Sequence, residues 1–547
     1  MNTTNNSPHN PPWFDPRMPD REACVLRHAL DRAAKLFPQR NLAQFENGTR
    51  WSYGEAHALA RRTAAGLRDL GVKRGDMVQV WLPNGVEATQ AWFGINYLGA
   101  VFAPVNTSYR GRLLEHVLQN TGAEILIVHA ALVDRLGGID TGKLKQIIVV
   151  GGDAVAPNHL TQRLFSSLDG DGDSFDDPVP LEPWDIYGVI YTSGTTGPSK
   201  GVLQTYLQIW TTGRSTYGYM RADDRMVINL PLFHVGGTSS VAGVLAAEGA
   251  FAMFERFDTA RFWQELRETG STMTCGLIGS MAEFLLKAEP RADDKDNPLR
   301  MLTMVPINDK TVALAKRFGF DWLTGFNMTE VSVPLVTPVN SEIAYCCGRP
   351  RTGCEVRVVD ANDIEVPSGV VGELIVRTDL PWALTPGYLN MPEATARAWR
   401  NGWFHTGDAF RRDADGNFFF VDRLKDTIRR RGENVSSIEV EADVAAFPGV
   451  IEAAAVGVPS PHGEEEILIC IARKPDATVE PEALVEFLRQ RMAHFMVPRY
   501  VRFLDVLPKT PTNKVQKAEL RAAGITPDTW DREAAGIILK RERFNRV

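Results

Sequence analysis

Short apolar runs and amphipathic segments alternate along the first part of the chain. The runs at 76–82 (DMVQVWL), 101–105 and 123–128 (AEILIV) are almost wholly apolar, which is typical of strands buried on both faces. The segments 84–98 and 112–119 between them have the apolar spacing of helices. This alternation predicts an α/β fold in which a doubly wound parallel sheet carries helices on both faces.

The same alternation starts again further along the chain. A second run begins with the predicted strand 187–192, and a third covers roughly 225–321. Two α/β subdomains lying side by side account for these runs. From 348 to 376 the pattern changes to short alternating strands separated by turn residues, which predicts a small β-rich subdomain.

A separate α+β pattern follows Asp422. Its predicted strands and helices are Val450–Val456, Glu466–Ala472, Tyr500–Leu504, Ser436–Ala446 and Glu482–His494. A length of 547 residues exceeds what a single core supports. We therefore predict a flexible N-terminal segment (1–20), a large domain (21–422) and a small, mobile C-terminal domain (423–547).

Composition narrows the class of protein. The net charge of −7 gives no electrostatic case for nucleic acid or an anionic membrane. The polar N-terminus has no signal-peptide design, and the longest weakly polar stretch, 241–254, is too short to span a bilayer. The sparse cysteines suit a reducing compartment and are interpreted as packing residues, so a cytoplasmic location is expected. They are Cys24, Cys275, Cys346, Cys347, Cys354 and Cys470.

A phosphate-binding loop is predicted after the strand ending at Thr192. Residues 192–201 (TSGTTGPSKG) hold five Ser/Thr hydroxyls, three glycines and one lysine. Glycines let backbone N–H groups approach an anion, hydroxyls add donors, and a lysine adds a mobile positive charge. The loop is not a Walker A motif, because Lys200 is followed by Gly201 and the glycine spacing differs. An ordinary P-loop NTPase is therefore disfavoured.

This loop resembles the signature of the adenylate-forming superfamily, which includes acyl-CoA synthetases, peptide-synthetase adenylation domains and firefly luciferase. The resemblance extends from about 25 to 520, and within it 377–408 is most similar to carnitine/crotonobetaine–CoA ligase-like enzymes. By resemblance, the loop holds the phosphates of ATP. The residues implied are Thr192, Ser193, Gly194, Thr195, Thr196, Gly197 and Lys200.

Two further motifs match the superfamily near the acyl site. In LPLFHVGG (230–237), relatives place the residue equivalent to His234 beside the carboxylate, at the entrance of the acyl tunnel. The motif lacks the aspartate that peptide-synthetase domains use for an amino group, which disfavours an α-amino acid substrate. In GFNMTE (325–330), the resemblance implies that Phe326 stacks on adenine and Thr329 contacts the α-phosphate. Glu330, with Thr195, would hold Mg²⁺.

The remaining motifs surround the predicted domain boundary. By resemblance, Asp408 of WFHTGD accepts hydrogen bonds from the ribose hydroxyls, and Arg423 contacts ribose or phosphate. Lys425 matches the hinge, and Gly432 matches a glycine that lies against the pantetheine arm of CoA. The basic run 429–431 is either a solvated strand face or a contact for CoA phosphates.

The last motif supplies a predicted catalytic lysine. Lys514, in LPKTPTNKVQK (507–517), matches the lysine of the superfamily's C-terminal loop, although Asn513 replaces the usual preceding glycine. Residues 521–547 lie beyond the resemblance and receive no role.

Together the motifs imply a ligase that uses ATP, Mg²⁺ and CoA to activate a small organic carboxylic acid. Catalysis would involve Lys514, Glu330, Thr329 and His234, and a homodimer is one assembly that the resemblance allows. Two alternatives stay open. The chain could load an acyl carrier protein in place of CoA, or it could be a non-catalytic nucleotide- or acyl-binding protein on the same scaffold. The polar Asn327 favours a short or polar acid, and a bulky ring acid fits the sequence as well.

Overall fold

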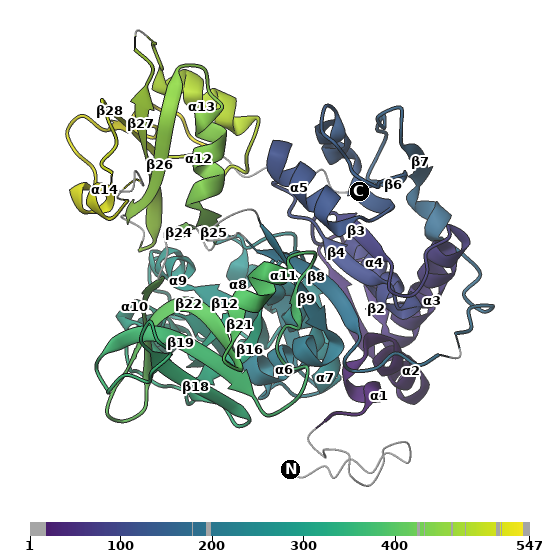
Figure 1. Cartoon of the computed structure of the whole chain (residues 1–547). Coiled ribbons are helices and arrows are strands. Elements are labelled where there is room, and N and C mark those ends of the chain that lie inside the picture. Colours follow the sequence, from purple (N-terminus) through teal and green to yellow (C-terminus); the bar gives the residue numbers. More distant parts are fainter. Residues whose placement is uncertain are drawn as a thin grey trace.

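The computed structural model describes most of the chain, including all the predicted sheets. The described residues are 18–177, 179–192, 199–423, 427–430, 433–460, 463–475, 477–509, 515 and 517–539. Most of the predicted N-terminal segment therefore lies outside them. Figure 1 shows a large body built from residues before about 420, with a smaller yellow-green domain standing on it.

The first sheet of the large domain has eight strands in the order β20-β9-β8-β4-β3-β5-β6-β7. Their bounds are β3 (Met77–Trp81), β4 (Val101–Pro104), β5 (Ile125–His129), β6 (Gln146–Val150), β7 (Thr161–Leu164), β8 (Ile186–Thr192), β9 (Lys200–Thr205) and β20 (Gly387–Tyr388). Every residue of β4 and β5 is buried, as expected for strands covered on both faces. The sheet is parallel except at one edge, where β9 runs antiparallel to both β8 and β20.

The second sheet has seven strands in the order β14-β13-β12-β10-β11-β1-β2, all parallel except β2. Their bounds are β1 (Asn41–Phe45), β2 (Arg50–Ser52), β10 (Arg225–Ile228), β11 (Ala250–Met253), β12 (Met273–Ile278), β13 (Met301–Val305) and β14 (Asp321–Leu323). It confirms the predicted second α/β subdomain.

Helices cover both faces of the two sheets. One hydrophobic core contains side chains of both sheets and of the helices between them, which are α2 (Leu26–Leu36), α3 (Tyr53–Asp69), α4 (Val86–Leu98), α6 (Tyr206–Tyr217) and α7 (Val235–Ala247). The short α1 (Arg21–Cys24) precedes them. The outer faces are covered by α5 (Gly111–Thr121) on the first sheet and by α8 (Phe262–Thr269), α9 (Gly279–Leu286) and α10 (Asp309–Phe318) on the second.

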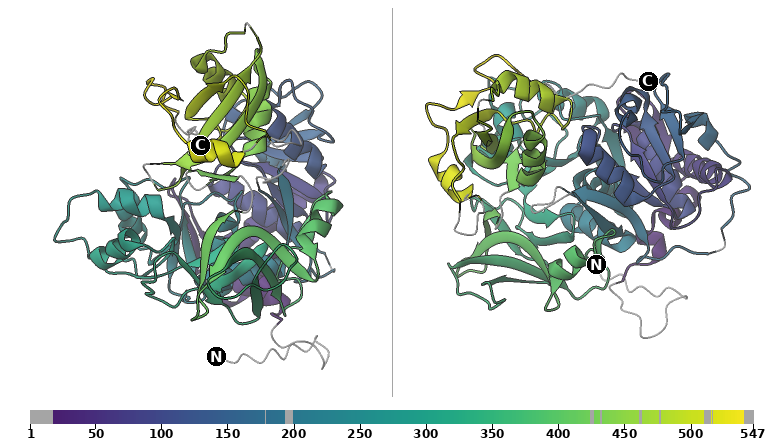
Figure 2. Two further views of the ribbon diagram at one scale, coloured as in Figure 1. Left: turned by 60° about the vertical axis from the view of Figure 1, so that its left-hand side comes forward. Right: turned by 45° about the horizontal axis from the view of Figure 1, so that its top comes forward.

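A β-rich subdomain completes the large domain (Figure 2). Its strands follow the order β15-β16-β17-β23-β22-β19-β18, with β21 paired to β22. Their bounds are β15 (Gly325–Met328), β16 (Val331–Val336), β17 (Cys346–Pro350), β18 (Cys354–Val359), β19 (Val371–Thr378), β21 (Trp399–Arg400), β22 (Trp403–Arg412) and β23 (Phe418–Arg423). The helix α11 (Pro392–Ala398) lies before β21. This subdomain is wider than the 348–376 predicted, because strands on either side of that segment pair with it.

The small domain contains a hairpin and a four-stranded sheet. The hairpin joins β24 (Thr427–Arg430) and β25 (Glu433–Ser436), and the sheet has the order β26-β27-β28-β29. The remaining bounds are β26 (Val450–Pro459), β27 (Glu465–Arg473), β28 (Tyr500–Leu504), β29 (Trp530–Asp531), α12 (Ser437–Ala445), α13 (Pro481–Arg489) and α14 (Lys517–Ala523). The fold class predicted from the sequence is confirmed. Across the described ranges, no helix is both long and apolar enough to cross a bilayer.

Candidate functional site

The predicted phosphate loop connects two neighbouring antiparallel strands. Thr192 is the last residue of β8 and pairs in register with Lys200, the first residue of β9. The loop residues Ser193, Gly194, Thr195, Thr196 and Gly197 lie outside the described residues. The two described residues that flank the loop, Thr192 and Lys200, therefore lie side by side at the ends of neighbouring strands.

The residues predicted to contact the α-phosphate and to hold Mg²⁺ are buried beside these strands. Thr329 and Glu330, in the turn between β15 and β16, are 9% and 6% exposed. The backbone carbonyl of Thr329 accepts hydrogen bonds from the Gln204 and Gln208 amides at 2.7 and 3.0 Å. Strand β9 and helix α6 therefore hold this turn against the phosphate-loop sheet.

Tyr388 joins Glu330 to Lys200, and sequence reasoning did not identify it. Its hydroxyl donates to Glu330 Oε1 at 3.0 Å, while Lys200 Nζ lies 4.7 Å from the centre of its ring. Burial and the Glu330 carboxylate raise the pKa of Tyr388 far above its ordinary range, so the hydroxyl stays a donor. A cation, a phenol and a carboxylate thus meet at one end of the predicted phosphate loop.

The predicted nucleotide residues lie on the β-rich subdomain. Asp408 in β22 is 3% exposed and pairs in register with Arg423 in β23, of which only the backbone is described. Phe326 in β15 packs edge-to-face on Phe410, with ring centres 4.9 Å apart. The exposed Asn327 uses its Oδ1 to accept from Val333 N at 3.1 Å, so its amide helps to hold the turn.

His234 lies where the two domains meet. It is the N-cap residue of α7, and its Nε2 is 2.9 Å from Glu433 Oε2 on the hairpin strand β25. Nearby, the Ser199 hydroxyl donates to Glu439 Oε1 of α12 at 2.9 Å. Burial raises the pKa of Glu439 to about 7. The structure therefore brings the hairpin and α12, and their acidic residues, to the predicted acyl and phosphate sites.

The described lysines on either side of the predicted catalytic lysine form ion pairs within the small domain. Lys514 lies outside the described residues, as do the hinge Lys425 and the pantetheine-site Gly432. On either side of Lys514, Lys509 pairs with Glu452 at 3.0 Å and Lys517 pairs with Glu441 at 2.5 Å. In this arrangement the hairpin, and not the flanks of the lysine loop, faces His234.

Arginines from both domains gather beside the same boundary. Burial and the Arg489 guanidinium lower the pKa of Arg110, and burial and Arg110 lower the pKa of Arg135 to about 9. Arg112 of the large domain and Arg491 of the small domain both pair with Asp443, at 3.1 and 3.2 Å.

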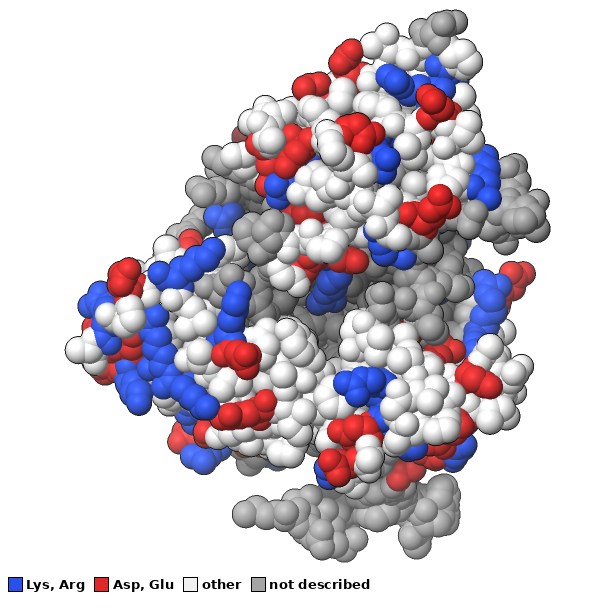
Figure 3. Space-filling model, turned by 90° about the vertical axis from the view of Figure 1, so that its left-hand side faces the viewer, with Lys and Arg blue, Asp and Glu red and all other residues white. Residues whose placement is uncertain are grey.

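Elsewhere, on the face in Figure 3, basic and acidic side chains are intermixed, without a broad region of one sign.

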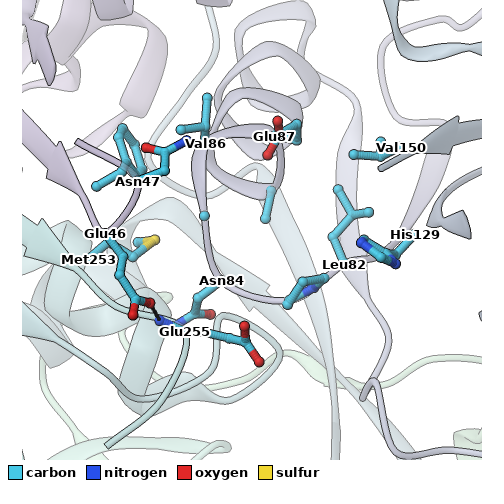
Figure 4. Close-up of a pocket in the computed structure, with 14 residues that line it drawn as sticks. Glu46, Asn47, Leu82, Asn84, Val86, Glu87, His129, Val150, Met253 and Glu255 are labelled. Carbon is cyan, nitrogen blue, oxygen red and sulfur yellow. Dashed lines mark hydrogen bonds between the residues drawn. The ribbon is translucent and has the colours of Figure 1, made fainter. Parts of the chain in front are cut away.

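A pocket of about 80 Å³ lies between the two sheets, at the carboxyl ends of β1, β3 and β11 (Figure 4). Three of its side chains are acidic, Glu46, Glu87 and Glu255, and the backbone N–H of Glu255 donates to Glu46 at 3.1 Å. None of the predicted site residues lines it. Its acidic lining suits neither a carboxylate nor a phosphate, so we assign it no part of the site.

A magnesium ion at this site would need oxygen ligands from the protein. Among the described residues, no three His, Cys, Asp or Glu side chains gather where they could hold a metal ion. A buried carboxylate such as Glu330 nevertheless fits Mg²⁺, which commonly takes one or two protein carboxylates and completes its shell with substrate phosphates and water.

Comparison with known proteins shows the family of this chain. Residues 30–389 match the model of the AMP-binding enzyme family, and residues 439–514 match that of the AMP-binding enzyme C-terminal domain. The chain is 29% identical over 511 residues to a crotonobetaine/carnitine–CoA ligase of Proteus mirabilis. That alignment covers 91% of this chain and 98% of the relative.

Solved structures share the fold. A fatty acyl CoA synthetase of Mycobacterium tuberculosis is 25% identical, with a TM-score of 0.65 and coverage of 92% of this chain and 99% of that one. An o-succinylbenzoate CoA synthetase of Bacillus subtilis is 22% identical, with a TM-score of 0.77 and coverage of 90% and 98%. Because the first family model spans well over half of the residues, the chain belongs to the AMP-binding enzyme family.

Proposed function

We propose that this chain is an ATP-dependent acid–CoA ligase, which forms an acyl-adenylate with release of pyrophosphate and then an acyl-CoA thioester with release of AMP. The observation that carries the proposal is the meeting of Lys200, Tyr388 and Glu330 at the end of the phosphate loop. The lysine cation suits the phosphates of a nucleoside triphosphate, and the buried carboxylate suits its metal ion.

The first half-reaction needs electrostatic stabilisation and no general base. The substrate carboxylate is already ionised near pH 7 and attacks the α-phosphorus of ATP, while pyrophosphate leaves. The loop 192–200 would hold the β- and γ-phosphates, Thr329 the α-phosphate and Asp408 the ribose. Glu330, with Thr195, would hold Mg²⁺, which supplies positive charge to the phosphate oxygens. Lys514 would bridge the carboxylate and the α-phosphate.

The second half-reaction would take place with the β24–β25 hairpin beside His234. The hairpin that carries Gly432 stands beside His234, which supports a role for Gly432 against the pantetheine arm. Arg110, Arg135 and Arg489 bring like charges together across the domain boundary, and an anion such as a CoA phosphate would relieve their repulsion. Rotation about Lys425 would exchange this hairpin for the lysine loop.

A cytoplasmic location and a homodimeric assembly complete the proposal. All six cysteines are free thiols, four of them buried, which supports a reducing compartment. The homodimer rests on family resemblance, and light scattering of the purified protein tests it.

The acid substrate is to be identified by pyrophosphate release with ATP, Mg²⁺ and a panel of acids, with and without CoA. The panel comprises carnitine, crotonobetaine, short and medium fatty acids, aromatic acids and sterol side-chain acids. If turnover requires CoA and occurs with one class of acid, the result supports the ligase and identifies the class of its substrate. Release without CoA-dependent turnover supports carrier loading, which a phosphopantetheinylated carrier then tests. No release with any acid contradicts the proposal for that panel.

A further inference from the structure

One ionic contact crosses the domain boundary directly at the acyl site. His234 Nε2 lies 2.9 Å from Glu433 Oε2 and 3.2 Å from Oε1, so both carboxylate oxygens face the same ring nitrogen. Glu433 opens strand β25, and its side chain is 20% exposed. The imidazole is 37% exposed, so the ring is held at Nε2 and is not fully enclosed.

The large domain holds the loop that carries His234 in place. Asn84 donates to the carbonyl of Leu230 at 2.9 Å and accepts from the backbone N–H of Leu232 at 2.9 Å. The Phe233 ring lies 4.8 Å from the imidazole, centre to centre. Because the loop is fixed on both sides of Pro231, the small domain brings Glu433 to the histidine, and not the reverse.

The two half-reactions differ in their need for a base. A carboxylate arrives ionised, whereas a thiol with an ordinary pKa of about 8.5 arrives mostly protonated at pH 7. The thiol must lose this proton as its sulfur attacks. A carboxylate that accepts the Nε2–H of an imidazole fixes the tautomer and leaves Nδ1 as the proton acceptor.

Resting on the proposed function, we propose that His234 is the general base for the thiol of the acyl acceptor and that Glu433 is its positioning residue. The thiol proton passes to His234 Nδ1 while sulfur forms a bond to the acyl carbon. The bond from that carbon to the AMP oxygen then breaks, AMP leaves with the electron pair, and the imidazolium returns its proton to water. Because His234 and Glu433 lie on different domains, the pair depends on how the domains are oriented, and we assign the complete base to thioester formation.

Other charged groups near the pair enter the interpretation of pH effects. Glu433 and Glu439 both raise the pKa of Tyr109, a buried tyrosine of the large domain that follows β4. Glu439 itself hydrogen-bonds Ser199. The pH dependence must therefore also be measured in a His234 variant. A pH effect caused by Glu439 or Tyr109 would persist in that variant.

The test is single-turnover thioester formation from enzyme-bound acyl-adenylate, measured from pH 5.5 to 8.5 beside pyrophosphate release in the same proteins. His234→Asn should slow the thioester step by roughly 10²-fold and abolish its fall at acid pH, since general-base catalysis is typically of this size. Glu433→Gln should slow the same step and Glu433→Asp should restore part of the rate, while pyrophosphate release should be unchanged in both Glu433 variants.

A double variant separates this role from simple docking. His234→Asn with Glu433→Gln should be no slower than His234→Asn alone, because the carboxylate acts through the imidazole. Asp443→Asn alone, which removes the contact to Arg112 across the same boundary, should leave the fall in rate at acid pH in place, and its effect on the rate should add in full to that of His234→Asn. An additive double variant, or an acid fall that survives His234→Asn, overturns the inference. Absence of acyl-CoA formation by the unaltered chain overturns the proposed function as well.

Discussion

At the scale of single residues, the site depends on one tyrosine that connects two motifs. Tyr388 donates to Glu330 Oε1 and its ring lies beside the Lys200 ammonium, so one side chain contacts both the cation and the carboxylate. Both partners come from sequence motifs, and the tyrosine lies 58 residues beyond Glu330. A hydrogen bond to a buried charged group is worth more than one between neutral groups.

Tyr388→Phe should slow pyrophosphate release about tenfold and raise the Mg²⁺ concentration needed for half-maximal rate, because a bond to a charged group is worth about 1.5–3 kcal/mol. The measurement is a Mg²⁺ titration of the initial rate. Tyr206→Phe is the matched control, since Tyr206 is equally buried but donates to the carbonyl of Asn96. An unchanged Mg²⁺ requirement in Tyr388→Phe would remove Glu330 as the metal ligand.

Sequence motifs located the candidate residues but not their contacts. The positions of Lys200, Glu330 and His234 followed from local strings of residues. The partners Tyr388 and Glu433 did not, because Glu433 is 199 residues from His234 and meets it only through the docking of two domains. The spacing of apolar residues around His234 or Glu433 carries no information about a contact between two domains.

At the scale of elements, the β24–β25 hairpin is anchored by a buried ion pair. Arg430 is 1% exposed and its Nε lies 2.6 Å from Glu466, while its Nη1 donates to the carbonyls of Phe495 and Val497. The sequence left the basic run 429–431 open between a solvated face and a phosphate contact. For Arg430 neither interpretation is correct, because its side chain is buried against residues of its own domain.

Arg430→Met should lower the free energy of unfolding of the small domain by about 3–5 kcal/mol, because removing one partner leaves a buried charge uncompensated. Denaturant titration followed by circular dichroism measures this loss. Arg429→Met, at the adjacent exposed position, should have little effect on stability. Equal loss in both variants would contradict the anchoring role of Arg430.

The elements themselves were largely predictable where burial sets the pattern. The strand predicted at 500–504 is β28, and the helix predicted at 84–98 begins at Val86, after Gly85. The helix predicted at 482–494 ends at Arg489, because buried residues beyond it belong to turns. Strand β29 escaped prediction, since it is two residues long and depends on pairing with β28.

At the scale of the whole molecule, three acidic residues of the small domain contact the large domain. Glu433, Glu439 and Asp443 meet His234, Ser199 and Arg112. The Glu439 contact makes docking dependent on pH. The docked carboxyl keeps its proton up to about pH 7, whereas an ordinary glutamate carboxyl releases it near 4.5. The contribution of Glu439 to docking is therefore fully present below about pH 4.5 and is lost as the pH rises from 4.5 to 7.

Small-angle scattering of the full chain from pH 5 to 8 should show a larger radius of gyration as the pH approaches 7. Glu439→Gln should keep the compact value across this range, because an amide does not ionise. Glu452→Gln is the control, since Glu452 pairs with Lys509 inside the small domain. A radius independent of pH in the unaltered chain would contradict the prediction.

The two half-reactions should separate in one variant. Lys514→Ala should slow pyrophosphate release by roughly 10²-fold or more, since it removes charge stabilisation from the first transition state. Thioester formation from supplied acyl-adenylate should be spared, because the flanking Lys509 and Lys517 bind within the small domain while the hairpin faces His234. Lys509→Ala is the comparison, and equal loss in both half-reactions would contradict a rotating domain.

The pairing of β20 with β9 limits how the protein can be shortened. β20 comes from a segment almost two hundred residues after β9, yet it closes the edge of the sheet that carries the phosphate loop. A truncated chain ending before Gly387 would leave Lys200–Thr205 as an open edge, which is a template for pairing between molecules and for aggregation. Any fragment produced to study nucleotide binding must therefore include residues 387–388, which lie well beyond β14, the last other strand of the two α/β sheets.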